Sequence, residues 1–242
     1  MRTGVAVVAL AVVVLAACSS GQRDERISVR STSTSATAPH VTTSTRASRP
    51  AGDALGTLDT LAVKGRAPKT GYSRDEFGPA WADVDHNGCD TRNDILNRDL
   101  TAKQWRTGTH DCVVVAGTVV DPYTGRTLTF EKANAIAVQI DHVVALSDAW
   151  QTGAQALSAA DRLRFANDPV NLFAVDGPTN ESKGDADAAS WLPPNRPFRC
   201  TYVEHQIAAK ARYGLWVTRA EADAMRRVLA TCPGARIPDG AS

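Results

Sequence analysis

The sequence predicts an α+β fold, in which a small β-sheet is surrounded by helices. Three observations lead to this prediction. Short β-branched runs lie in the middle of the chain, at 112–120 and 126–130, and such runs favour strands. Apolar residues recur at helical spacing before and after these runs. Four cysteines accompany these segments, so we expect disulfides to stabilise the fold.

The first elements are helical. An amphipathic helix is predicted by apolar residues at helical spacing, Leu55, Leu58, Leu61 and Ala62. Residues 73–76 have the order of a capping box that starts a helical turn. A polar loop over 81–90 follows, and Thr91 is expected to cap a helix with Asp94 near its positive end. This helix carries the apolar residues Ile95, Leu96 and Leu100.

Strands are expected next. Residues 112–120 and 126–130 flank a turn, Asp121 to Gly125, that contains the Pro and Gly a tight turn needs. These segments therefore predict a hairpin. Residues 136–140 predict a further strand, and residues 171–175 another.

Helices are also expected in the later part of the chain. Ser158 is placed to cap a helix that ends at Asn167-Asp168-Pro169. Two more helices are predicted near the end, one through residues 202–211 and one capped by Thr218 with Glu221 three residues later. Their apolar residues are best explained as core packing.

The first residues predict export. An apolar run, Val5 to Ala17, is too short to span a bilayer comfortably and ends in Leu-Ala-Ala-Cys, which resembles a bacterial lipobox. Residues 1–18 are therefore expected to be a lipoprotein signal, with Cys18 lipidated as the mature first residue and holding the chain at the outer face of the cell membrane. The alternative is a simple secretory signal with an accidental cysteine, which would release the protein.

A disordered tether and one domain are expected after the signal. Residues 19–52 are rich in Ser and Thr and almost free of large apolar residues, so they cannot offset their ordering entropy by burial. Residues 53–242 are enough for one domain with a sizeable core, and they show no internal repeat. The net charge of +1 neither favours nor excludes a polyanionic partner, since phosphate binding needs only a local patch.

Four cysteines remain after Cys18, an even number in an exported chain. None has CxxC spacing, so we expect two disulfides and no zinc. Of three possible connectivities we favour Cys89 with Cys112 and Cys200 with Cys232, because each pair joins neighbours in sequence without crossing.

Three segments carry polar residues suited to chemistry. Asp141 and His142 follow the strand at 136–140, Asn171 begins the next strand, and Asn180 and Lys183 lie in a predicted helical segment. The order is strand, loop, strand, helix. It resembles the ββα-metal core of HNH endonucleases, and IDHVVAL followed by NDPVNLFAVDGPTNESKGD resembles exported bacterial HNH proteins related to the nuclease domain of GmrSD-type restriction enzymes. GYSRDEFGPAW, NGCDTRNDILNRDL and VVDPYTGRTLTF also resemble upstream segments of that family, so the similarity covers essentially all of the chain after the tether.

The resemblance implies a role for each residue. His142 is the expected general base, because an imidazole is largely neutral near pH 7. Asp141 and Asn180 are the expected protein ligands of Mg²⁺ or Mn²⁺, hard cations that prefer oxygen. Asn171 is expected to hold the loop that orients His142.

Each of these residues also has a purely structural interpretation. An Asp-His pair at a strand end can form a hydrogen-bonded turn, Asn171 an Asx-turn and Asn180 a helix cap. Lys183 and Arg92 are further candidates for contacts with substrate phosphate, with a solvated charge and a surface salt bridge as the alternatives.

A separate motif imitates a calcium loop. Asp83 to Gly88, with Asp94 at the twelfth position, has the spacing of such a loop. The twelfth residue is aspartate rather than the usual glutamate, and Cys89 in the loop is expected to be in a disulfide. A bound calcium ion would be structural.

The sequence therefore predicts an exported, lipid-anchored, metal-dependent endonuclease that cuts nucleic acid, with DNA the first choice of substrate. The alternatives are a nuclease-like domain that binds a surface without catalysis and a calcium-stabilised wall protein. No protein partner can be inferred from the sequence, and nothing in it distinguishes DNA from RNA or single from double strands.

Overall fold

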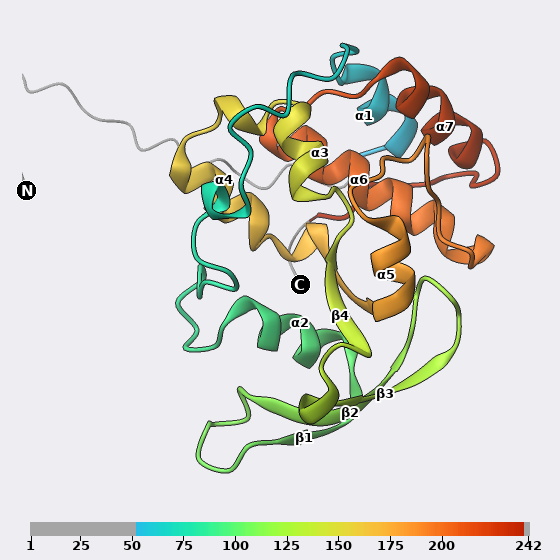
Figure 1. Cartoon of the computed structure of the whole chain (residues 1–242). Helices are drawn as coiled ribbons and strands as arrows, with labels where there is room; N and C mark the ends of the chain where they lie inside the picture. The colour runs from blue at the N-terminus through green and yellow to red at the C-terminus, as the bar shows by residue number, and fades with distance from the viewer. Residues whose placement is uncertain (1–51, 240–242) are drawn as a thin grey trace, which may run out of the picture. The chain divides into compact units, whose positions relative to one another are not determined.

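The computed structural model of the chain describes residues 52–239. The predicted signal with Cys18, and the tether up to residue 51, lie outside the described residues. The described chain has a mixed α/β fold with two small antiparallel sheets and two disulfides (Figure 1). None of the helices within residues 52–239 has the length and apolar character of a membrane-spanning helix.

The first part of the described chain is helical, as expected. Its elements are α1 (Ala54–Thr60), the 3₁₀ helix η1 (Arg74–Phe77) and α2 (Thr91–Asp99). The predicted cap of α2 is displaced by one residue: Asp90, rather than Thr91, accepts a hydrogen bond from the Asn93 backbone N–H. The Thr91 hydroxyl instead donates to the Ala82 carbonyl and ties the preceding loop to the helix.

A three-stranded sheet follows. Its strands are β1 (Thr101–Trp105), β2 (Val114–Val120) and β3 (Thr127–Glu131), in the order β1-β2-β3. The hairpin of β2 and β3 is the predicted one. The edge strand β1 is not predicted from the sequence, because TAKQW is largely polar and four of its five residues are exposed.

The second sheet contains only β4 (Val138–His142) and β5 (Leu172–Asp176), so the expected single sheet is in fact two. Strand β4 pairs with β5 and not with either outer strand of the first sheet, β1 or β3. Strand β4 begins and ends two residues later than predicted, and its last two residues are the buried Asp141 and His142.

Helix α5 (Gly177–Lys183) follows β5 directly, so the chain has the order β4, β5, α5. The Asp176 side chain caps the helix by accepting from the Thr179 backbone N–H. A Cβ atom on Gly177 would lie 2.0 Å from the Ile136 carbonyl oxygen. Only glycine therefore permits this close approach of α5 to the segment before β4.

Helices cover the remaining faces. The chain segment that connects β4 to β5 contains the helices α3 (Leu146–Gln151) and α4 (Ala159–Ala166) and the 3₁₀ helices η3 (Ala154–Ala156) and η4 (Pro169–Asn171). The 3₁₀ helix η2 (Lys132–Asn134) precedes β4. The last elements are η5 (Arg196–Phe198), α6 (Arg199–Tyr213) and α7 (Arg219–Leu229). The predicted caps Ser158 and Thr218 are both present, the latter as a full capping box with Glu221.

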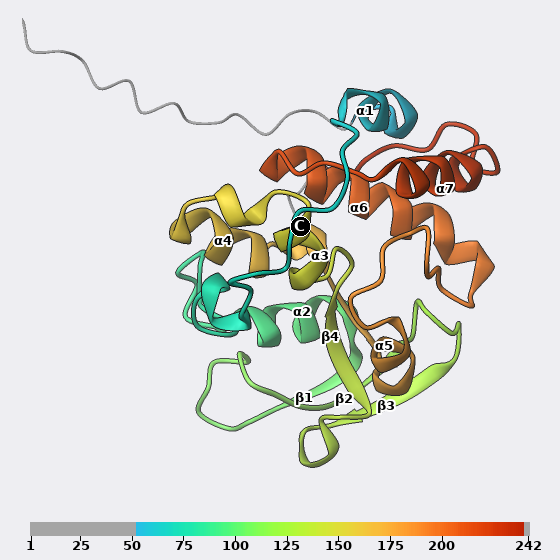
Figure 2. The ribbon, with the colours of Figure 1, turned by 45° about the horizontal axis from the view of Figure 1, so that its top comes forward.

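Three clusters of buried apolar side chains hold these elements together. One joins α1, α6 and α7, a second joins η1, α3 and α4, and a third joins α2 to both sheets. Figures 1 and 2 show the three-stranded sheet at one end, α1, α6 and α7 at the other, and β4 with α5 between them. The end of β4 therefore lies where the clusters meet, and its surroundings are fixed from several sides.

The disulfides join Cys89 to Cys112 and Cys200 to Cys232, the two pairs favoured from the sequence. The first connects the loop before α2 to the segment just before β2. The second connects the first turn of α6 to the segment after α7. Each closes a short stretch of chain, of 23 and 32 residues in sequence separation.

Replacing Cys200 and Cys232 together by alanine is expected to lower the free energy of unfolding by about 2–4 kcal/mol, because the unfolded chain regains the entropy that the cross-link removes. For a domain of this size the melting temperature should fall by about 5–15 °C. Thermal unfolding followed by circular dichroism measures this. An unchanged melting temperature would show that the packing of α6 on α7 suffices without the bond.

Candidate active site

Asp141 and His142 end strand β4, where they pair with Phe173 and Leu172 of β5. Both side chains are buried, with 6% and 7% of their surface exposed. Burying such groups without partners is unfavourable, so the structure must supply partners for each.

The Asp141 carboxylate has two partners. The Lys183 ammonium, from α5, lies 2.9 Å from Oδ1, and the Tyr123 hydroxyl, from the turn between β2 and β3, donates to Oδ2. Burial raises the pKa of Asp141, while Lys183 and Tyr123 oppose this rise by stabilising the ionised form. An acid at the end of a buried strand is therefore tolerated because three separate elements meet there.

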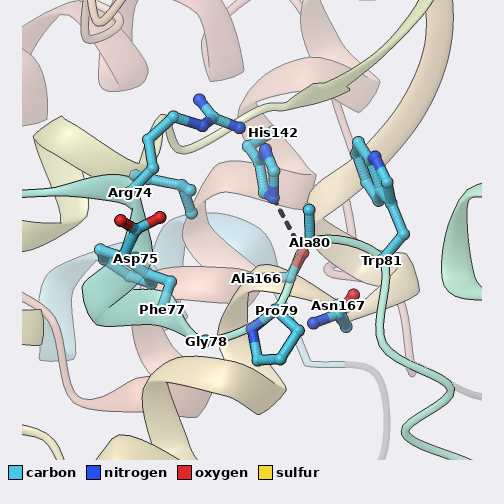
Figure 3. Close-up of a pocket in the computed structure, with 11 residues that line it drawn as sticks. Arg74, Asp75, Phe77, Gly78, Pro79, Ala80, Trp81, His142, Ala166 and Asn167 are labelled. Atoms are coloured by element: carbon cyan, nitrogen blue, oxygen red, sulfur yellow. Dashed lines mark hydrogen bonds between the residues drawn. The ribbon is translucent and has the colours of Figure 1, made fainter.

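The His142 ring has one partner and one free nitrogen. Nε2 lies 2.8 Å from the Ala166 carbonyl oxygen, at the end of α4 (Figure 3). A carbonyl can only accept, so we assign the proton to Nε2 and leave the lone pair on Nδ1. Within residues 52–239, Nδ1 makes no hydrogen bond. Burial, with smaller effects of Arg74 and Lys183, lowers the pKa of His142 to about 3, so the ring is neutral at neutral pH.

An aromatic side chain packs on the same ring. Trp81 stacks on His142, with ring centroids 5.9 Å apart and an angle of 14° between the planes. The indole limits rotation of the imidazole and shields one of its faces. The orientation of His142 is thus set by a hydrogen bond at its edge and a ring on its face.

Asn171 fixes the backbone that follows His142. Its Oδ1 accepts from the Val144 N–H at 2.9 Å, its Nδ2 donates to the Val144 carbonyl at 3.3 Å, and its own carbonyl accepts from the Val143 N–H at 2.9 Å. Asn171 is fully buried. These bonds fix the backbone of residues 143–144, directly after His142.

Asn180 lies on α5 beside β4. Its Nδ2 donates to the Gln139 Oε1 at 2.8 Å, which leaves Oδ1 without a hydrogen bond in the described part of the chain. The side chain is half-buried. Gln139 thus orients the Asn180 amide so that its oxygen is free to bind a ligand.

Two cavities meet at His142. The large cavity, of about 470 Å³, contains Asp141, His142 and Asn180 in its lining, together with Lys69 and Arg74. The small cavity, of about 210 Å³, shares Arg74, His142 and Leu146 with it and is otherwise lined mainly by residues 77–81 and by Ala166 and Asn167 (Figure 3). The residues predicted as base and metal ligands therefore face one common space.

The two residues predicted to contact substrate phosphate are engaged elsewhere. Lys183 is only 2% exposed, and its ammonium lies 2.8 Å from the His142 carbonyl as well as 2.9 Å from Asp141. Arg92 is half-buried and donates to the Val138 carbonyl at 3.4 Å. Lys183 neutralises a buried carboxylate, and Arg92 binds a backbone carbonyl of β4. This geometry supports structural roles for both cations.

The donor set suits a hard cation. Asp141 accepts two hydrogen bonds but has about four lone-pair positions, and Asn180 Oδ1 is free in the same cavity. Among residues 52–239 no three His, Cys, Asp or Glu side chains converge as a metal-binding group. An ion in the large cavity would rely on these two oxygens and on water, as Mg²⁺ commonly does.

The loop from Asp83 to Asp94 satisfies its own carboxylates. The Asn87 and Gly88 backbone N–H groups donate to Asp83, and the Asn87 amide donates to Asp85 and Asp94. Cys89 is in the disulfide with Cys112. The carboxylate oxygens that would bind calcium thus accept hydrogen bonds from amide N–H groups of the same loop. This geometry adds no support for a calcium ion.

The sequence did not single out Tyr123, Gln139, Arg74 or Trp81 as site residues. Tyr123 belongs to a segment with turn composition, and Gln139 is the polar residue of an otherwise apolar strand. Arg74 and Trp81 lie more than 60 residues before His142. The signal available for them was the resemblance of GYSRDEFGPAW to an upstream family segment, which assigns no role.

The fold and the site define a small mixed α/β protein whose polar cavity is built on a strand–strand–helix unit with an Asp-His pair at the strand end. The chain belongs to the family described as GmrSD restriction endonucleases, C-terminal domain, which matches residues 90–228. It is also 40% identical over 184 residues to an "Uncharacterized secreted protein" of Arthroderma benhamiae, covering 75% of this chain and 86% of that protein. No solved structure matches the chain.

Proposed function

We propose that the protein is an exported, divalent-metal-dependent endonuclease of the ββα-metal (HNH) type that hydrolyses phosphodiester bonds in nucleic acid, with DNA the first choice of substrate. One observation carries the proposal: Asp141, His142 and Asn180, from the strand–strand–helix unit β4-β5-α5, line the same cavity. The family description names restriction endonucleases, and the curated relative is described as secreted.

His142 acts as the general base in this proposal. Its Nδ1 accepts a proton from the attacking water while Nε2 keeps its proton for Ala166. Water adds to phosphorus, the bond from phosphorus to the leaving oxygen breaks, and that oxygen takes a proton from solvent. A pKa of about 3 describes the ring without substrate; a bound phosphate anion raises this pKa, because negative charge stabilises the imidazolium form.

The other residues position the reaction. Asp141 and Asn180 are the protein ligands for Mg²⁺ or Mn²⁺, which would supply positive charge to stabilise the phosphate and the leaving oxygen. Lys183 and Tyr123 hold the Asp141 carboxylate in place. Asn171 and Trp81 hold His142.

The direct test is incubation of purified residues 53–242 with supercoiled plasmid and with linear RNA, in Mg²⁺, in Mn²⁺ and in EDTA. We expect cutting that requires metal. The second candidate is a non-catalytic surface-binding module, and one observation favours it: both Asp141 oxygens are already bonded within the protein. Absence of cutting in either polymer with either metal would favour that module.

Substitutions of the proposed metal ligands should change the metal dependence of cutting, whereas substitution of the proposed base should not. Asp141→Asn and Asn180→Ala are expected to raise the Mg²⁺ concentration needed for half-maximal cutting, because each removes or weakens one of the two protein oxygens. Raised Mg²⁺ or Mn²⁺ should then restore part of their activity. Metal titrations of cutting rate measure this. Cutting by Asn180→Ala with the wild-type metal dependence would remove Asn180 from the ligand set.

We also propose that Cys18 carries a lipid anchor. Cys18→Ser is expected to move the protein from the membrane fraction to the soluble fraction or to block signal processing, since the acyl chains on a lipoprotein cysteine provide the membrane affinity. Fractionation followed by immunoblotting detects either outcome. Membrane association that survives the substitution would point to a different attachment, and a soluble wild-type protein to a simple secretory signal.

A further inference from the structure

Arg74 stands at the border of both cavities. It is the first residue of η1, it is exposed, and it lines the large and the small cavity together with His142. Its guanidinium extends toward the imidazole ring (Figure 3). Within residues 52–239 it forms no hydrogen bond and no ion pair. A free cation therefore lies beside the proposed base.

The other cations near the site have protein partners. Lys183 binds Asp141, and Lys69 lies 3.0 Å from Asp185. Arg66, three residues before Lys69, lies 2.8 Å from both Asp148 and Asp187. Of the cations that line the two cavities, Arg74 is thus the one whose charge is not already matched by a carboxylate in the described structure.

The position of Arg74 is fixed even though its side chain is exposed. Ser73 caps η1 by accepting from the Asp75 backbone N–H, and Phe77, at the end of η1, is buried with Trp150 and Phe165. Glu76 binds Arg162 of α4 through its carbonyl and its carboxylate. These contacts hold η1 against α3 and α4, so the guanidinium is presented from a rigid base.

We propose that Arg74 binds the scissile phosphate of the nucleic acid, with its planar guanidinium donating to two non-bridging oxygens. This inference rests on the proposed nuclease function and names the phosphate-binding residue of that site. The fork of N–H donors matches two phosphate oxygens in a way that a lysine ammonium does not. The phosphate then lies between Arg74 on one side of His142 and the Asp141 and Asn180 oxygens on the other.

Arg74 lies outside the family match, which begins at residue 90. Segment 73–81 supplies both Arg74 and the Trp81 ring that packs on His142. The site is therefore completed by residues that precede the matched region. Arg74 takes the role in phosphate binding that the sequence predicted for Lys183 and Arg92.

The test compares Arg74→Met, Arg74→Lys and a control, Arg227→Met, which removes an exposed arginine of α7 that lines neither cavity. We expect Arg74→Met to lower kcat/KM for DNA cutting about 100-fold, as loss of a donor to transition-state charge does. Arg74→Lys should recover part of this loss, and Arg227→Met should cut like the wild type. All three should keep the wild-type melting temperature.

Salt dependence separates phosphate binding from a structural effect. Loss of one phosphate contact should reduce the slope of log(kcat/KM) against log salt by about one unit. In a His142→Ala background, which is expected to cut too slowly to degrade the probe during the measurement, Arg74→Met should also weaken binding of a fluorescently labelled oligonucleotide, measured by anisotropy.

Two outcomes would overturn the inference while leaving the nuclease function intact: Arg74→Met cutting like Arg227→Met, or a reduced rate with an unchanged salt slope. If the wild type cuts no polymer, the proposed function fails separately, and the anisotropy measurement still decides about Arg74. Equal oligonucleotide affinity with and without the arginine would then overturn the inference as well.

Discussion

His142→Ala is expected to lower the rate of DNA cutting about 10²–10⁴-fold, the usual contribution of a general base. The alanine variant loses the Nδ1 lone pair that is free to accept a proton from water. Excess Mg²⁺ or Mn²⁺ should not restore the activity, because metal cannot replace a proton acceptor. Single-turnover cutting of a labelled duplex measures the effect on the chemical step.

The matched control is His110→Asn. His110 is exposed, lines neither cavity, and has a positive φ of 49° that asparagine tolerates. It should cut at the wild-type rate. Circular dichroism should show the same fold for wild type and both variants. Rescue of His142→Ala by metal to the same extent as Asn180→Ala would contradict the assignment of the base.

The milder variant Asn171→Ala separates orientation from chemistry. It removes both side-chain bonds to Val144 but no reacting group. Its activity should therefore lie between those of the wild type and His142→Ala. Because Asn171 is fully buried, the substitution can also destabilise the fold. The melting temperature of the variant must therefore be measured together with its activity.

The parts of the fold that sequence predicts well are those with local signals. The caps Ser158 and Thr218 and the β2–β3 hairpin depend on residues within a few positions of one another. The strand β1 was missed because its polar residues take their conformation from pairing with β2, a tertiary effect that composition does not reveal. For the same reason the separation into two sheets was not foreseen.

In the candidate site, too, some residues have a local sequence signal and others are placed only by tertiary packing. Asp141, His142, Asn171 and Asn180 were singled out because they occur in a recognisable order along 40 residues. The positions of Lys183 and Arg74 depend on how α5 and η1 pack against β4, which no local pattern encodes. Sequence therefore singled out residues that the structure brings to one cavity, Asp141, His142 and Asn180. It did not reveal that Lys183 is buried against Asp141 while Arg74 is exposed at the same cavity.

A buried charge cluster carries the largest expected effect on stability. The Lys210 ammonium of α6 lies 2.9 Å from Glu221 of α7 and 3.1 Å from Asp148 of α3, and all three side chains are at most 2% exposed. Burial lowers the pKa of Lys210, but the two carboxylates outweigh this and raise it above its ordinary value. The cluster thus joins three helices through charges that have no access to water.

Lys210→Met is expected to lower the free energy of unfolding by about 3–5 kcal/mol, because it leaves two buried carboxylates without their shared cation. The control Arg226→Met breaks an ion pair with Asp59 whose side chains are 40% and 54% exposed, and exposed pairs contribute about 0–1 kcal/mol. Urea unfolding of both variants gives the comparison. Equal losses for the two would show that Glu221 and Asp148 are satisfied in other ways, for Asp148 through Arg66, which lies 2.8 Å from its Oδ1. A much larger loss for Lys210→Met would show that the buried carboxylates of α3 and α7 depend on the Lys210 ammonium to balance their charge.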